Sequence, residues 1–143
     1  AVTKYISPDA YALNDKLRRG ERLTAPERKW IIDLNTALTK LPAFSGNLSR
    51  SLYFYDDQSL QEYLTTYQPG NKVCEKSYVS TTKGEIYNPD GQVQIHILNT
   101  TDGRDISMYN QGEQEVLYAP DAEFIVIDVR QVEGVYHIIM EEL

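Results

Sequence analysis

The sequence predicts an α+β fold in which N-terminal helices pack on a mainly antiparallel β-sheet. Helical periodicity dominates the first half of the chain, and residues with high β propensity dominate the second half. A doubly wound fold would instead alternate strands and helices along the whole chain. The 143 residues match the size of one domain with its own hydrophobic core. We therefore expect a single domain over residues 1–143.

Three helices are predicted before the β-rich part. The first opens at Ser7-Pro8-Asp9, because serine caps free backbone amides and proline suits a first turn, and it stops at Gly20. The second begins at the capping box of Thr24 and Glu27 and ends before Pro42. The third runs from Asp57 to Tyr67. Apolar side chains at helical spacing mark the second and third helices: Ile31, Leu34, Leu38, Leu41, and Leu60, Tyr63, Leu64, Tyr67.

β-branched and aromatic residues predict the strands. One short segment, Leu48 to Phe54, precedes the third helix, and the others follow Pro69-Gly70. Turn signals at Asn88–Gly91 and Ala119–Asp121 separate later strands. The strand regions after the break are Lys72–Thr82, Val93–Ile97, Val116–Tyr118, Glu123–Val129 and Val135–Met140.

Composition and charge narrow the class of function. The net charge of −7 repels nucleic-acid phosphates, so nucleic acid is a less favoured partner. No apolar run approaches the roughly 20 residues of a membrane span, and no export signal opens the chain. One cysteine and two separated histidines do not form a zinc motif, so we expect no metal. We expect Cys74 to be a small buried hydrophobic residue, and His96 and His137 to be sheet residues.

Three short segments carry the functional signal: Asn47–Tyr53 (NLSRSLY), Tyr78–Thr82 (YVSTT) and Gln111–Leu117 (QGEQEVL). In order and approximate spacing they resemble the arginine, Ser-Thr-Ser and Glu-X-Glu motifs of the ADP-ribosyltransferase family. The stretch from Glu113 to Pro120, with the apolar strand after it, is the most specific local match. The resemblance covers most of the chain. It implies that residues 1–143 form one catalytic domain, built as a split β-sandwich, with NAD as its substrate.

The chemistry of NAD cleavage gives each motif residue a role. Breaking the nicotinamide–ribose bond develops positive charge on the ribose, and by resemblance the Glu115 carboxylate stabilises it and accepts a hydrogen bond from the ribose 2′-hydroxyl. The planar guanidinium of Arg50 suits bidentate binding of the pyrophosphate. Ser80 resembles the family serine that orients the glutamate and the ribose. Thr81 supports this strand, and Ser51 replaces the glycine whose backbone approaches the nicotinamide in many relatives.

Glu113 bears on the identity of the acceptor. It precedes Glu115 by two residues, so in an extended segment both carboxylates lie on the same side. In the family, a glutamate at this place accompanies arginine acceptors, where it orients and helps deprotonate the guanidinium. An aromatic side chain often stacks on nicotinamide in such sites, and Tyr53 and Tyr87 are the candidates.

The resemblance therefore implies a mono-ADP-ribosyltransferase that modifies a protein arginine as a bacterial toxin or effector. We expect it to be soluble, to be secreted or delivered into a target cell as part of a larger toxin, and to act in the cytoplasm; an immunity protein is a possible partner. Three alternatives stay open: NAD hydrolysis, ADP-ribosylation of a nucleic acid, and a degenerate member that binds a partner without catalysis.

Overall fold

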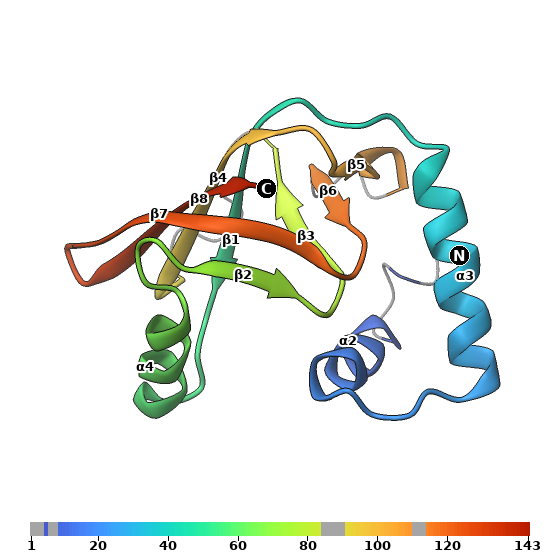
Figure 1. Ribbon diagram of the computed structural model, residues 1–143, viewed down its shortest axis with the longest axis horizontal. Coiled ribbons are helices and arrows are strands. Elements are labelled where there is room, and N and C mark those ends of the chain that lie inside the picture. The colour runs from blue at the N-terminus through green and yellow to red at the C-terminus, as the bar shows by residue number, and fades with distance from the viewer. Residues whose placement is uncertain (1–4, 6–8, 84–90, 110–113) are drawn as a thin grey trace.

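The computed structural model describes residues 5, 9–83, 91–109 and 114–143 (Figure 1). Helices α2 (Asp9–Arg19), α3 (Ala25–Thr39) and α4 (Asp57–Thr66) precede most of the strands, and β1 (Gly46–Leu52) lies between α3 and α4. A short 3-10 helix, η1, spans Ser107–Tyr109. The later strands are β2 (Lys72–Glu75), β3 (Val79–Thr82), β4 (Val93–Thr100), β5 (Arg104–Asp105), β6 (Glu115–Tyr118), β7 (Ala122–Val132) and β8 (Val135–Glu142).

The ends of the helices are set by local side-chain chemistry. Helix α3 begins with the expected capping box: the Glu27 amide donates to Thr24 Oγ1 at 3.3 Å, and the Thr24 amide donates to the Glu27 carboxylate at 2.8 Å. Gly20 follows α2 with a φ of 68°, a backbone conformation that glycine adopts without steric cost. Across the described residues, no helix has the length and apolar character needed to cross a membrane.

The strands form one eight-stranded sheet in the order β2-β7-β8-β4-β1-β3-β6-β5. All neighbouring pairs are antiparallel except β4 and β8, which are parallel. Strands β1 and β3 are joined by a single residue pair, Ser49 opposite Thr82. This narrow junction divides the sheet into a larger half that ends at β1 and a smaller half of β3, β6 and β5.

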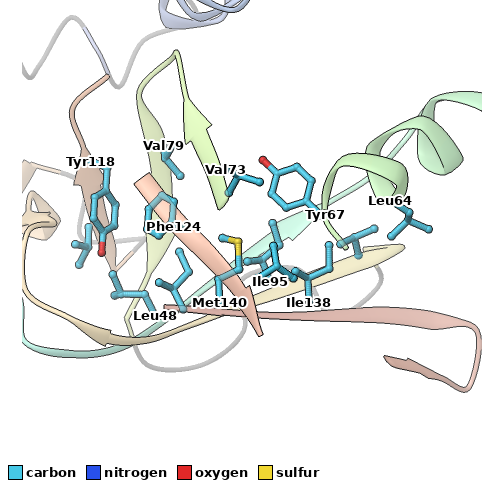
Figure 2. Packing of buried hydrophobic residues seen from close by; sticks show 14 of the residues in the cluster. Leu48, Leu64, Tyr67, Val73, Val79, Ile95, Tyr118, Phe124, Ile138 and Met140 are labelled. Atoms are coloured by element: carbon cyan, nitrogen blue, oxygen red, sulfur yellow. The ribbon is translucent and has the colours of Figure 1, made fainter. Parts of the chain in front are cut away.

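The two halves pack on each other through a shared apolar core (Figure 2). Leu48 and Met140 from the larger half lie in one cluster with Val79 and Tyr118 from the smaller half. The intervening Leu117 of β6 faces the opposite way, into a second cluster formed with α2 and α3. The smaller half is thus covered by the larger half on one face and by helices on the other, which confirms the expected helices on a split sandwich.

Three details differ from the sequence prediction. The region Lys72–Thr82 is two strands in different halves of the sheet, since β2 pairs with β7 whereas β3 pairs with β1 and β6. The two-residue strand β5 was not predicted. Cys74 is exposed, so the expectation of a buried cysteine is wrong: its neighbour Val73 takes the inward position, and alternation turns Cys74 outward.

Candidate active site

A serine–glutamate pair joins the two central strands of the smaller half. Ser80 lies in β3 opposite Leu117 of β6, and Thr82 lies opposite Glu115. Ser80 and Glu115 are therefore diagonal neighbours on one face of the sheet. The Ser80 hydroxyl donates a hydrogen bond to Glu115 Oε2 at 2.6 Å. Glu115 is 7% exposed, whereas Ser80 is exposed. The carboxylate is therefore buried, and the residue that donates to it is accessible to solvent.

Arg50 of β1 completes the set of residues predicted to handle NAD. It lines a pocket of about 180 Å³ together with Ser80, Glu115 and Ser51. The junction of β1 with β3, one residue earlier at Ser49, holds the two halves of the sheet together at this point. Arg50, Ser80 and Glu115 are far apart in the chain, and the fold brings them to one pocket.

A second, larger pocket of about 320 Å³ lies beside the first, since Arg50 and Leu52 line both. Its walls are mostly apolar side chains of the shared core, with the charged groups of Arg18 and Glu75 added. Tyr53 also lines this second pocket and is 75% exposed. The two pockets together form a bipartite cleft, polar at Ser80 and Glu115 and apolar beyond Arg50.

The remaining predicted residues occupy different positions. Thr81 is buried, and its hydroxyl donates to the Val116 carbonyl at 2.7 Å, so this hydroxyl ties β3 to β6. The Ser51 hydroxyl donates to Gln94 Oε1 at 2.6 Å, which ties β1 to β4, and Ser51 also lines the smaller pocket. Glu113 and Tyr87 lie outside the described residues.

Sequence reasoning missed a buried network behind the Ser80–Glu115 pair. Asn14 of α2 donates through Nδ2 to the Tyr5 hydroxyl at 3.0 Å, and its Oδ1 accepts from the Tyr78 amide at 3.1 Å. Burial raises the pKa of the Tyr5 hydroxyl, and hydrogen bonds with Asn14 and Ser80 oppose that effect. The Glu115 carboxylate raises the same pKa, whereas the Arg50 guanidinium lowers it. Ser80, Glu115 and Arg50 therefore all affect the pKa of the Tyr5 hydroxyl.

Asn14 is expected to hold this network in place. Replacing it with leucine leaves the Tyr78 amide and the Tyr5 hydroxyl without their buried partner, which is expected to reduce the free energy of unfolding by about 1–3 kcal/mol. Urea denaturation measures this change. Asn35 offers a matched control, because it accepts from the Tyr78 hydroxyl on the far side of the ring, away from Ser80. NAD turnover that falls in Asn14→Leu but not in Asn35→Leu, at equal folded fraction, supports a positioning role, and equal turnover in both contradicts it.

This cleft, with a serine–glutamate pair and an arginine between two halves of a split sheet under N-terminal helices, has the architecture of an ADP-ribosyltransferase. No family model matches the sequence. A curated relative is NAD(+)--protein-arginine ADP-ribosyltransferase Tre1 of Serratia proteamaculans (strain 568), which is 29% identical over 147 residues. That alignment covers 100% of this chain but 31% of Tre1, so the chain spans about a third of the relative's length.

Solved structures agree in fold. The ADP-ribosyltransferase Vis from Vibrio splendidus, in complex with agmatine, superposes with a TM-score of 0.74 at 21% identity, covering 99% of this chain and 72% of Vis. Exoenzyme S from Pseudomonas aeruginosa, bound to carba-NAD in a complex with human 14-3-3 protein beta, gives a TM-score of 0.77 at 20% identity and covers 99% of this chain and 70% of that one. The family resemblance drawn from the three motifs is confirmed, and the chain has the ADP-ribosyltransferase fold.

Proposed function

We propose that the chain is a mono-ADP-ribosyltransferase that cleaves NAD and transfers ADP-ribose to an arginine of a target protein. The observation that carries this proposal is the 2.6 Å hydrogen bond from Ser80 to the buried Glu115 carboxylate, in a pocket that Arg50 also lines. A carboxylate held in a low-dielectric site and aimed at a developing positive charge is an effective electrostatic catalyst. The name of Tre1 and the agreement in fold support the same activity.

In the proposed reaction, each of the four motif residues has one role. Arg50 binds the pyrophosphate in the bipartite cleft. The bond between the ribose carbon and the nicotinamide nitrogen breaks, and its electron pair leaves with nicotinamide. The Glu115 carboxylate accepts a hydrogen bond from the ribose 2′-hydroxyl and stabilises the positive ribose, while Ser80 fixes the orientation of that carboxylate. A guanidine nitrogen of the acceptor then attacks the ribose carbon, and Glu113 takes the proton that this nitrogen releases.

An arginine acceptor follows from Glu113 and from the relatives. Tre1 is named as a protein-arginine enzyme, and Vis binds agmatine, which carries the same guanidinium group as arginine. We further propose that this domain acts in the cytoplasm of a target cell as the catalytic part of a larger toxin. The greater length of Tre1 supports this arrangement. An immunity protein that blocks the cleft would protect the producing cell.

Labelled NAD tests the proposal with a protein lysate or with agmatine as the acceptor. Wild type is expected to label protein and agmatine, and Glu113→Gln is expected to release nicotinamide while losing transfer to the guanidinium. The surface variant Glu123→Gln is the matched control, since Glu123 is an exposed residue of β7. Nicotinamide release without label on any acceptor would make the protein a hydrolase, and label removed by nuclease would make nucleic acid the acceptor. Intact NAD with wild type would exclude catalysis.

A further inference from the structure

The two histidines of this protein meet on the outer face of the larger half of the sheet. Alternation along β4 buries Ile95 and Ile97 in the core and turns His96 outward, and Ile138 in β8 likewise turns His137 outward. In the parallel ladder His96 lies opposite Ile139, and His137 lies opposite Gln94, so the imidazoles are diagonal neighbours. Their rings stack at 5.3 Å and 16°, with His96 Nε2 at 3.0 Å from His137 Nδ1.

The rings are suited to metal binding in their neutral form. A neutral imidazole has one ring nitrogen with a lone pair that can bind a metal ion. In the hydrogen bond between the rings, one of the two facing nitrogens carries a proton. If that proton moves to the other nitrogen of its own ring, both facing nitrogens present lone pairs and the net charge is unchanged.

Ser49 provides an independent sign of an unfilled polar position beside the pair. It lies opposite His96 in the antiparallel register of β1 and β4, so both side chains stand on the same face of the sheet. Ser49 is 8% exposed, and within the described residues its hydroxyl has no hydrogen-bond partner. A buried hydroxyl without a partner is costly, and a metal-bound water would satisfy it.

We propose that His96 and His137 bind one late first-row transition-metal ion such as Zn²⁺, Ni²⁺ or Cu²⁺. Imidazole nitrogens are favourable ligands for these ions. Two nitrogens bound tetrahedrally at about 2.0–2.1 Å stand roughly 3.3 Å apart. In the hydrogen-bonded pair the facing nitrogens lie on the line between the ring centroids, so each ring also turns to direct its lone pair at the ion. The described part of the chain holds no group of three or more His, Cys, Asp and Glu ligands, so water completes the coordination shell. Ser49 binds one of these waters.

The surroundings permit a cation at this place. Arg130 of β7 lies opposite His137 on the same face, and its charge is balanced by Asp128, whose carboxylate is 2.6 Å from Arg130 Nε. Neither histidine is among the described residues that line the two pockets, although Ser49 shares a face with Thr82 and Glu115 through the β1–β3 and β3–β6 pairings. Variants at the histidines should therefore leave NAD turnover unchanged.

Titration with Zn²⁺ or Cu²⁺ alone tests the site. We expect one equivalent of Zn²⁺ by calorimetry, a rise in melting temperature on adding Zn²⁺, and a Cu²⁺ electron paramagnetic resonance spectrum split by two imidazole nitrogens. His96→Gln and His137→Gln are each expected to abolish all three signals, and Ser49→Ala to weaken Zn²⁺ binding by about tenfold. Cys74→Ser is the matched control, since Cys74 is the single thiol and is exposed, and it should bind as wild type does.

A second measurement on wild type keeps the test independent of how the variants fold. Because the chain has two histidines, its NMR spectrum contains two sets of imidazole signals. Bound Zn²⁺ is expected to shift both sets together at one equivalent. Unshifted signals, or Zn²⁺ affinity that persists in folded His96→Gln and His137→Gln, would show that the pair is only a hydrogen bond between two rings.

Discussion

Replacing Glu115 with glutamine is expected to lower kcat/KM for NAD cleavage by about 10³-fold, the cost typical of removing a central electrostatic group from an active site. Glutamine has the shape of glutamate and still accepts the hydrogen bond from Ser80, which in wild type is 2.6 Å long. The substitution therefore removes the negative charge and little else. Nicotinamide release, followed at several NAD concentrations, measures the loss.

The stability of the same variant separates a catalytic role from a structural one. Glu115 is 7% exposed, and a buried carboxylate has lost much of its hydration. We expect Glu115→Gln to unfold in urea at the wild-type concentration or at a higher one, because the neutral amide is less costly to bury. The exposed Glu123→Gln variant should change neither quantity. If Glu115→Gln loses turnover only because less of the protein is folded, our assignment of Glu115 as the catalytic carboxylate is contradicted.

Local chemistry made much of the fold predictable. The capping box of Thr24 and Glu27 lies within four residues, and so its two hydrogen bonds depend on neighbouring sequence alone. The stripe that includes Leu34 and Leu38 follows from helical periodicity, and both side chains are buried. The motif residues Ser80 and Glu115 were likewise identifiable from sequence, because the segments that contain them resemble the Ser-Thr-Ser and Glu-X-Glu motifs of the ADP-ribosyltransferase family.

Non-local pairing was not predictable by such means. The sequence from Lys72 to Thr82 contains no signal that divides it into two strands. Its first four residues pair with β7, whereas its last four pair with β1 and β6. The network from Tyr5 through Asn14 to Tyr78 joins residues 64 positions apart, and no spacing rule relates them. The meeting of His96 with His137 depends on the parallel pairing of β4 with β8, which the order of elements does not reveal.

The pleat of β1 separates the side chains of one sequence motif. Alternation points Arg50 to the face of its partner Ile95, and Ser49 and Ser51 to the opposite face. Ser49 pairs with Thr82, and Thr82 pairs with Glu115, so that opposite face is continuous with the face of the Ser80–Glu115 pair. The Ser51 hydroxyl bonds to Gln94 on β4, so serine in place of the usual glycine ties β1 to β4 beside the smaller pocket, which Ser51 also lines. A sequence motif lists these three residues together, but the pleat of the strand assigns them to different surfaces.

Replacing Arg50 with lysine is expected to lower kcat/KM for NAD by about 10- to 100-fold, since hydrogen bonds to charged groups contribute about 1.5–3 kcal/mol. Lysine keeps the positive charge but has a single ammonium group, which cannot bind two pyrophosphate oxygens through a planar fork. We expect the effect mainly in KM, because the pyrophosphate is not the reacting centre and its contacts are alike in the ground and transition states. Initial rates over a wide range of NAD concentration resolve KM from kcat.

Arg22→Lys is the matched control for this substitution, because Arg22 is exposed between α2 and α3 and lines neither pocket. It should leave KM and kcat as in wild type. A fall in kcat with unchanged KM in Arg50→Lys would instead place the guanidinium beside the ribose, where it would act on the transition state.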